Sequence, residues 1–137
     1  GLVVFRYDSP LFFANADDFR HRAEWALSTA EAGTRWLLVN AEAIVQVDLT
    51  SLDAIEELRA ELASRDIRLA VARAKQELVE EFDRVGLLDR IGRAYVFPTL
   101  PTAVRAYLMD FEEEFGSLPE GIEIPKLPSD ALTHTDD

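Results

Sequence analysis

The stretch Val47-Asp-Leu-Thr-Ser-Leu-Asp-Ala-Ile-Glu-Glu-Leu58 decides how this chain is interpreted, because it follows a hydrophobic strand at Trp36–Val39 and opens an amphipathic helix. Thr50 is predicted as the N-cap with Asp53 at N3, since both side chains can accept hydrogen bonds from free amides of the first turn. A helix start after a strand is also a place where anions bind and where an added phosphate acts strongly. The segment therefore predicts either ordinary capping or a regulatory site.

Strand and helix patterns alternate on both sides of this stretch. Two apolar runs, Leu2–Tyr7 and Leu11–Ala14, are separated only by a turn too short for a crossover, so they are predicted to pair as an antiparallel hairpin. Further strands are predicted at Arg35–Asn40, Arg68–Ala72 and Tyr95–Phe97, and helices at residues 15–30, 51–65, 75–85 and 99–115. This order predicts an α/β fold with a mostly parallel central sheet, its first strand antiparallel, flanked by helices.

Composition limits the classes of function. The chain has 137 residues, 48% of them apolar, and no cysteine, which excludes disulfides, thiolate metal sites and cysteine nucleophiles. The net charge of −12 disfavours nucleic acid and anionic membrane surfaces as partners. No apolar run reaches membrane-spanning length, so no direct membrane insertion is predicted. His21 and His134 have no companion at metal-ligand spacing, and no set of nucleophile and base is visible, so neither a metal site nor catalysis is predicted.

The acidity is concentrated at the C-terminus, where Lys126 is the sole basic residue of residues 110–137. Prolines and charges after Gly116 favour extended chain. We therefore predict a domain at residues 1–116 and an acidic, mostly disordered tail at residues 117–137. A strand that begins at Leu2 without a preceding methionine predicts a domain taken from a longer protein.

Polar residues at the predicted carboxyl ends of the strands form the candidate ligand site, because ligands of α/β sheets bind at that edge. The candidate nucleotide-binding residues are Asn15, Asn40, Asp48, Thr50, Ser51, Arg73 and Lys75. Capping chemistry and solvated surface charge are the alternative interpretation, since neither G-x-x-x-x-G-K-[ST] nor G-x-G-x-x-G occurs. No cofactor is required on this interpretation.

Adjacent Phe12 and Phe13 would point to opposite faces of a strand, which predicts that both faces of the sheet are covered. The alternative is that one of them, or Trp25 on the outer side of its helix, belongs to a docking surface.

Four stretches carry patterns that occur together in one family: Leu2–Arg22, Val47–Leu58, Ala74–Ile91 and Val96–Ala106. They resemble the STAS domain (sulfate transporter and anti-sigma factor antagonist), and specifically the C-terminal cytoplasmic domain of a bacterial SulP-type anion transporter. The resemblance implies a non-enzymatic regulatory and interaction domain at the cytoplasmic face of the cell membrane. Its implied partners are the transmembrane part of its own transporter chain and other cytosolic proteins. It further implies a regulatory nucleotide, GTP or GDP (or ATP).

Stand-alone members of this family suggest an alternative function. They are anti-sigma factor antagonists, switched by phosphorylation of a serine that directly follows the aspartate at this helix start. Here Leu49 follows Asp48 and cannot accept phosphate, which leaves Thr50 and Ser51 as candidate phosphorylation sites.

Overall fold

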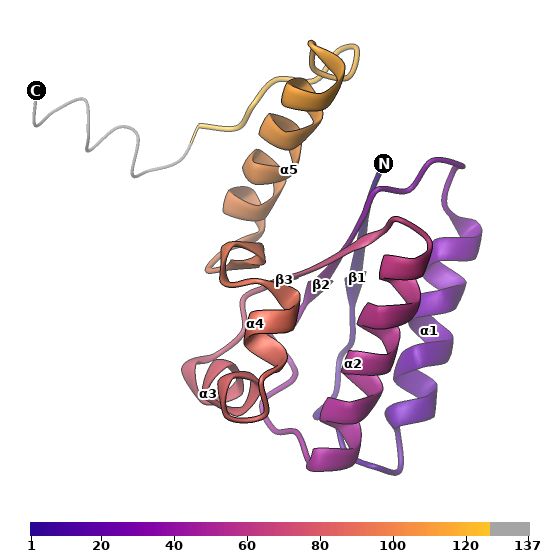
Figure 1. The fold of residues 1–137 in the computed structure, drawn as a ribbon, viewed down its shortest axis with the longest axis vertical. Coiled ribbons are helices and arrows are strands. Elements are labelled where there is room, and N and C mark those ends of the chain that lie inside the picture. The colour runs from indigo at the N-terminus through magenta and orange to yellow at the C-terminus, as the bar shows by residue number, and fades with distance from the viewer. Residues whose placement is uncertain (127–137) are drawn as a thin grey trace, which may run out of the picture.

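The computed structural model describes residues 1–126; His134 and the last part of the predicted tail lie outside the described residues. One sheet contains four strands in the order β1 to β4, and every pairing in it is parallel. Figure 1 shows β1, β2 and β3 side by side. The strands are β1 (Leu2–Arg6), β2 (Trp36–Asn40), β3 (Arg68–Ala72) and β4 (Val96–Phe97). The helices are α1 (Ala16–Thr29), α2 (Leu49–Ser64), α3 (Gln76–Arg84), α4 (Leu87–Ile91) and α5 (Leu100–Phe115), with a 3-10 turn η1 at Arg93–Tyr95.

Both faces of the sheet are covered, and the side chains of β2 alternate between them. Leu37 and Val39 join a core formed with helices α1 to α4, whereas Trp36 and Leu38 join a second core beneath α5. Strand order follows chain order, so crossovers of one hand place α1 and α2 on the same face (Figure 1). Helix α5 covers the other face. The chain that follows α5 turns back, and Leu118 and Ile124 pack against the second core.

The predicted hairpin and the antiparallel first strand are wrong. Strand β1 pairs in parallel with β2, with Leu2 opposite Trp36 and Arg6 opposite Asn40, and α1 is the crossover between them. The chain passes beyond the sheet after β1 rather than turning back. There Leu11 forms an isolated parallel β-bridge with Val47, which lies beyond the end of β2.

The expectation that Phe12 and Phe13 point to opposite faces of the sheet is also wrong, because their segment is not part of the sheet; both faces are nevertheless covered, as predicted. Both rings are exposed, Phe13 to 73%. Trp25 is 69% exposed on the outer side of α1. The other tryptophan, Trp36, is buried between the sheet and α5.

The predicted cap of α2 is displaced by two residues. Asp48, not Thr50, is the N-cap, and its carboxylate accepts a hydrogen bond from the Ser51 backbone amide. Thr50 and Asp53 lie exposed within the first turns of the helix. The predicted helix at residues 99–115 is confirmed as α5, and Thr99 is its N-cap, in a reciprocal pair with Thr102.

Candidate functional site

Asp48 is the centre of the rim at the carboxyl ends of the strands. Its Oδ1 atom accepts hydrogen bonds from the backbone amide of Ser51 at 2.9 Å and from Ser51 Oγ at 2.8 Å. Its Oδ2 atom accepts a third bond from the Phe13 backbone amide at 2.8 Å. The bonds from Ser51, and then that from Phe13, hold the pKa of this carboxyl below its usual value. A carboxylate of this chain therefore already occupies the positive end of α2.

The hydroxyl-bearing residues after Asp48, Thr50 and Ser51, differ in solvent exposure. The Ser51 side chain is fully buried and uses its hydroxyl to bond Asp48, so a reagent could reach it only if the helix start opened. Thr50 is exposed one residue earlier. Of the two predicted phosphorylation sites, only Thr50 faces solvent in the structure.

The side chains of the two predicted asparagines, Asn15 and Asn40, stabilise loops through hydrogen bonds to the backbone. Asn15 accepts a bond from the Phe12 amide at 2.9 Å and donates one to the Pro10 carbonyl at 2.8 Å, which folds residues 10–15 into a compact turn. Asn40, at the end of β2, is buried, and its side-chain oxygen accepts a bond from the Glu42 amide at 3.1 Å. Neither side chain caps a helix.

The predicted cations Arg73 and Lys75 lie after β3. Arg73 has a positive φ of 63° and forms an ion pair of 3.1 Å with Glu42. The same carboxylate pairs with Arg6 at 3.1 Å. Glu42 therefore links the ends of β1 and β3, a role that sequence reasoning missed although Glu42 stands just past the end of β2. Lys75 is exposed at the start of α3, and its amine forms no hydrogen bond or ion pair with residues 1–126.

The structure thus brings the predicted site residues into separate groups. Asp48, Thr50 and Ser51 share the start of α2, Arg73 belongs to the Glu42 cluster, and Asn15 stabilises its own loop. The strand order never reverses, so the crevice that a topological switch point creates is absent among the described strands. A groove of about 730 Å³ lies instead near the amino ends of β2 and β3, at the opposite end of the sheet.

Four exposed apolar side chains gather at the rim, and we call them the rim patch: Phe12, Phe13, Val45 and Leu49. They come from two segments that lie side by side, since the Leu11 amide bonds the Gln46 carbonyl at 2.9 Å and the Phe13 amide bonds Asp48. Phe13 and Leu49 are 73% and 66% exposed. Exposed apolar groups collected in one region typically mark an interaction surface.

Residues 1–126 contain no cluster of three or more His, Asp or Glu side chains suited to a metal ion. No helix within these residues has the length and apolar character needed to cross a membrane.

Comparison with known proteins agrees with this architecture. The family model of the STAS domain matches residues 1–103. Over 107 residues the chain is 52% identical to the "Probable sulfate transporter Rv1739c" of Mycobacterium tuberculosis, which covers 78% of this chain and 19% of that protein. The chain therefore spans about a fifth of the length of that relative.

Two solved structures share the fold. The SulP transporter STAS domain from Vibrio cholerae has a TM-score of 0.68 at 21% identity, over 82% of this chain and 84% of that one. The murine Slc26a9 anion transporter has a TM-score of 0.70 at 22% identity, over 76% of this chain and 17% of that one.

Proposed function

Because the chain belongs to the STAS domain family, we propose that it is the cytoplasmic regulatory and interaction domain of a SulP-type sulfate transporter. The rim patch is the surface with which it contacts the transmembrane part of that transporter. The function is non-enzymatic. It consists in binding the rest of the transporter and so changing the rate of transport.

The rim patch is the observation that carries this proposal. In this patch the apolar side chains of Phe12, Phe13, Val45 and Leu49 are exposed to water. Burial of them against another surface is favourable in free energy, because it removes apolar area from water. Its two segments are fixed by the Asp48 carboxylate and by the bridge of Leu11 to Val47, so the surface is preorganised for binding. The relative at 52% identity has about four fifths of its length outside the match, and that remainder is the occupant that we assign to the patch.

Sulfate uptake by vesicles that contain the complete transporter tests the proposal. Phe13→Ser and Leu49→Ser remove apolar area from the patch and leave the Phe13 amide bond to Asp48 in place. Trp25→Ser is the matched control, because this ring is equally exposed but lies on α1 outside the patch. We expect both patch variants to change the uptake rate at unchanged abundance and the control to leave it unchanged. Patch variants that match the control would refute the proposal.

Regulation by a nucleotide belongs to the same proposal and comes from the family resemblance. At the rim the geometry offers the exposed amine of Lys75 and the Arg73 guanidinium, although Arg73 is paired with Glu42. The carboxylate of Asp48 would repel a phosphate at the start of α2. Titration of the chain with GDP, GTP and ATP tests this, and saturable NMR shifts at Arg73 and Lys75 are the expected result.

The alternative function is a phosphorylation-controlled signalling module. Exposure of Thr50 favours this residue over buried Ser51 as the modified one. Mass spectrometry after incubation with a cognate kinase distinguishes the two functions, since stoichiometric phosphate on Thr50 would support the alternative.

A further inference from the structure

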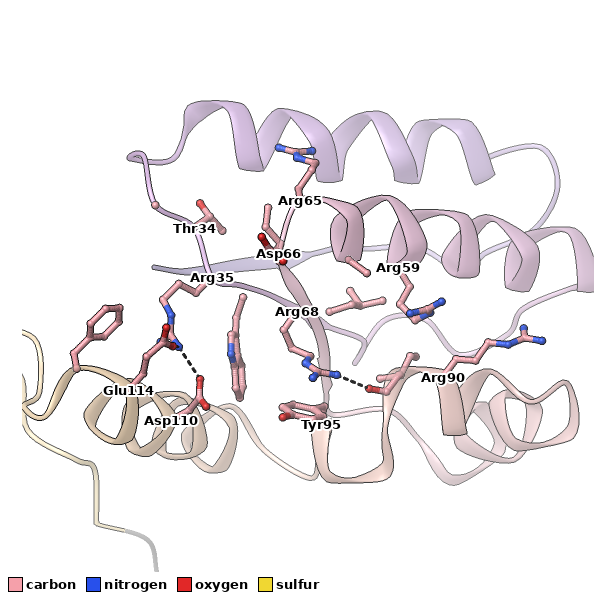
Figure 2. Close-up of a pocket in the computed structure, with 17 residues that line it drawn as sticks. Thr34, Arg35, Arg59, Arg65, Asp66, Arg68, Arg90, Tyr95, Asp110 and Glu114 are labelled. Carbon is pink, nitrogen blue, oxygen red and sulfur yellow. Dashed lines mark hydrogen bonds and ion pairs between the residues drawn. The ribbon is translucent and has the colours of Figure 1, made fainter.

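Arginines from several elements line the groove near the amino ends of β2 and β3, and we call it the arginine groove: Arg35, Arg59, Arg65, Arg68 and Arg90. Figure 2 shows Arg35 paired with Asp110 and Glu114 of α5. Arg59 pairs with Glu56 at 2.7 Å. Arg65 pairs with Glu24 at 3.2 Å. The Arg68 guanidinium stacks on the Tyr95 ring, with its carbon 3.9 Å from the ring centroid. Most of these guanidinium groups therefore hold neighbouring elements of the chain together.

The outer side of β1, by contrast, has no partner. This strand lies at one edge of the sheet and pairs only with β2 among residues 1–126. The Gly1 carbonyl accepts a hydrogen bond from the Trp36 amide at 3.0 Å, so the odd-numbered residues of β1 turn their backbone groups toward β2. The backbone groups of the alternate residues point away from the sheet: Leu2, Val4 and Arg6. Their amides and carbonyls form no hydrogen bond within the described part of the chain.

This edge lacks the features that usually prevent pairing. Natural sheets protect an exposed edge strand with lysine, proline, a β-bulge or a very short strand. Strand β1 is the regular sequence Leu-Val-Val-Phe-Arg, its register with β2 is continuous, and its single charge belongs to the last residue, Arg6. A regular apolar edge of this kind is a template for one further β-strand.

The side chain of Val4 is exposed at the same edge. Its neighbours Val3 and Phe5 point to the opposite face and pack in the core with helices α1 to α4. Helix α5 packs mainly over β2, β3 and β4, and Val4 is left 50% exposed. A strand added beside β1 brings a side chain directly next to Val4 and removes apolar area from water.

We infer that the edge of β1 binds β1 of a second copy of this chain, antiparallel and centred on Val4. In this register the residues whose backbone groups point outward lie opposite one another, Val4 opposite Val4 and Leu2 opposite Arg6. Each of these pairs exchanges two hydrogen bonds, and the two Val4 side chains meet on the same face. The inference goes beyond the proposed function and does not depend on it.

The properties of β1 favour a second copy as the occupant. Its valines and phenylalanine favour extended chain, and in a second copy the strand is already folded, so pairing costs less conformational entropy than the ordering of an unfolded segment. The antiparallel register keeps the Arg6 charges of the two copies at opposite ends of the interface. The other edge strand, β4, has only the two residues Val96–Phe97, so association ends at two copies and does not continue as a fibre.

Sedimentation velocity of the 137-residue chain over a range of concentrations tests the inference, together with amide hydrogen exchange measured by NMR. We expect the mass to rise from monomer to dimer as the concentration increases. Over the same range, exchange at Leu2, Val4 and Arg6 should slow at least about tenfold. Exchange at Val3 and Phe5 should change much less, because their amides already bond to β2.

Two variants locate the contact. Val4→Lys places two like charges opposite each other at the centre of the interface and should weaken dimerisation at least about tenfold. Met109→Lys is the matched control, since Met109 is 52% exposed on α5 and the variant adds the same charge away from β1. Dispersed amide signals from both variants verify that they fold.

Monomer mass at every concentration would overturn the inference, as would equal effects of the two lysine variants. A dimer that forms without slower exchange at Leu2, Val4 and Arg6 would assign the contact to another surface, such as the rim patch, and would also overturn it. Slow exchange of these amides in a monomer would show that another segment covers the edge, with the same consequence.

Discussion

Asp48 accepts a hydrogen bond from the backbone amide of Phe13 at 2.8 Å with one carboxylate oxygen, while the other oxygen caps α2. One side chain therefore joins the start of a helix to a loop that lies 35 residues earlier in the chain. The loop carries Phe12 and Phe13, and the helix start carries Leu49. This carboxylate, together with the bridge between Leu11 and Val47, therefore sets the geometry of the rim patch.

Removal of the Asp48 carboxylate should lower the stability of the fold and increase the mobility of the loop at residues 11–14. Asp48→Ala loses an N-cap, and the exposed Phe13 amide exchanges its carboxylate partner for water, so we expect the free energy of unfolding to fall. Urea denaturation measures this change, and NMR relaxation should report faster motion of residues 11–14. Asp53→Ala is the control, since its exposed side chain should change stability by less than about 0.5 kcal/mol. Equal effects of both variants would contradict this role of Asp48.

Stability should depend on pH through the same group. The lowered pKa of Asp48, caused first by its bonds from Ser51, means that its contribution is fully present above the usual aspartate pKa of about 3.9. This contribution is lost as the pH falls through the lower pKa of the folded state. Asp18 and Glu56 also have lowered pKa values, through Tyr7 and Arg59, so the wild-type curve alone is not diagnostic.

A difference measurement isolates Asp48 from the other carboxyls. The stability advantage of the wild type over Asp48→Asn, measured by urea denaturation, should shrink when the pH is lowered from neutral into the acid range below the usual aspartate pKa. An advantage that is constant with pH would show that the charge of Asp48 contributes nothing.

A negative charge should destabilise the fold strongly at position 51 but only slightly affect stability at position 50. Ser51 is fully buried, so Ser51→Glu places a charge in the core and should cost several kcal/mol or prevent folding. Thr50→Glu lies exposed in the first turn of α2 and should change the free energy of unfolding by less than about 1 kcal/mol. Thermal unfolding of both variants checks this. Tolerance of Ser51→Glu would contradict the burial of that side chain.

Arg35 should stabilise the docking of α5. Its guanidinium lies over the rings of Tyr107, Phe111 and Phe115, at 5.2–5.6 Å from their centroids, and pairs with Asp110. Arg35→Met keeps the aliphatic contact but removes the charge, and should lower the free energy of unfolding by about 1–2 kcal/mol. Arg22→Met, on the exposed side of α1, is the control and should have a smaller effect in the same denaturation experiment.

The regular elements were predictable because their signals are local. The buried run of β2 and the apolar stripes of α2 and α5 are visible in the sequence, and the start of the last helix was correctly predicted at Thr99. The hairpin was wrong because Leu11–Ala14 is as apolar as a strand, and no local signal reveals that the chain has left the sheet. The cap of α2 was misplaced because Asp48, Thr50 and Ser51 are all good capping residues, and tertiary contact with Phe13 decides among them.

The arginine groove could not be predicted. Arg59, Arg68 and Arg90 belong to three elements that only the fold brings together, and single arginines on a helix or at the end of a strand ordinarily face solvent. Likewise Glu42 has no motif around it, and its link between Arg6 and Arg73 follows from the parallel alignment of β1, β2 and β3.

Contact between the rim patch and the transmembrane part of the transporter can be measured directly by photo-cross-linking. A photoreactive phenylalanine analogue at position 13 of the complete protein, irradiated in membranes, should form cross-links that mass spectrometry assigns to the transmembrane part of the transporter. The same analogue at position 25 of α1 should form few, although its side chain is equally exposed. Cross-links at equal yield from both positions, or none from position 13, would contradict the proposed docking surface.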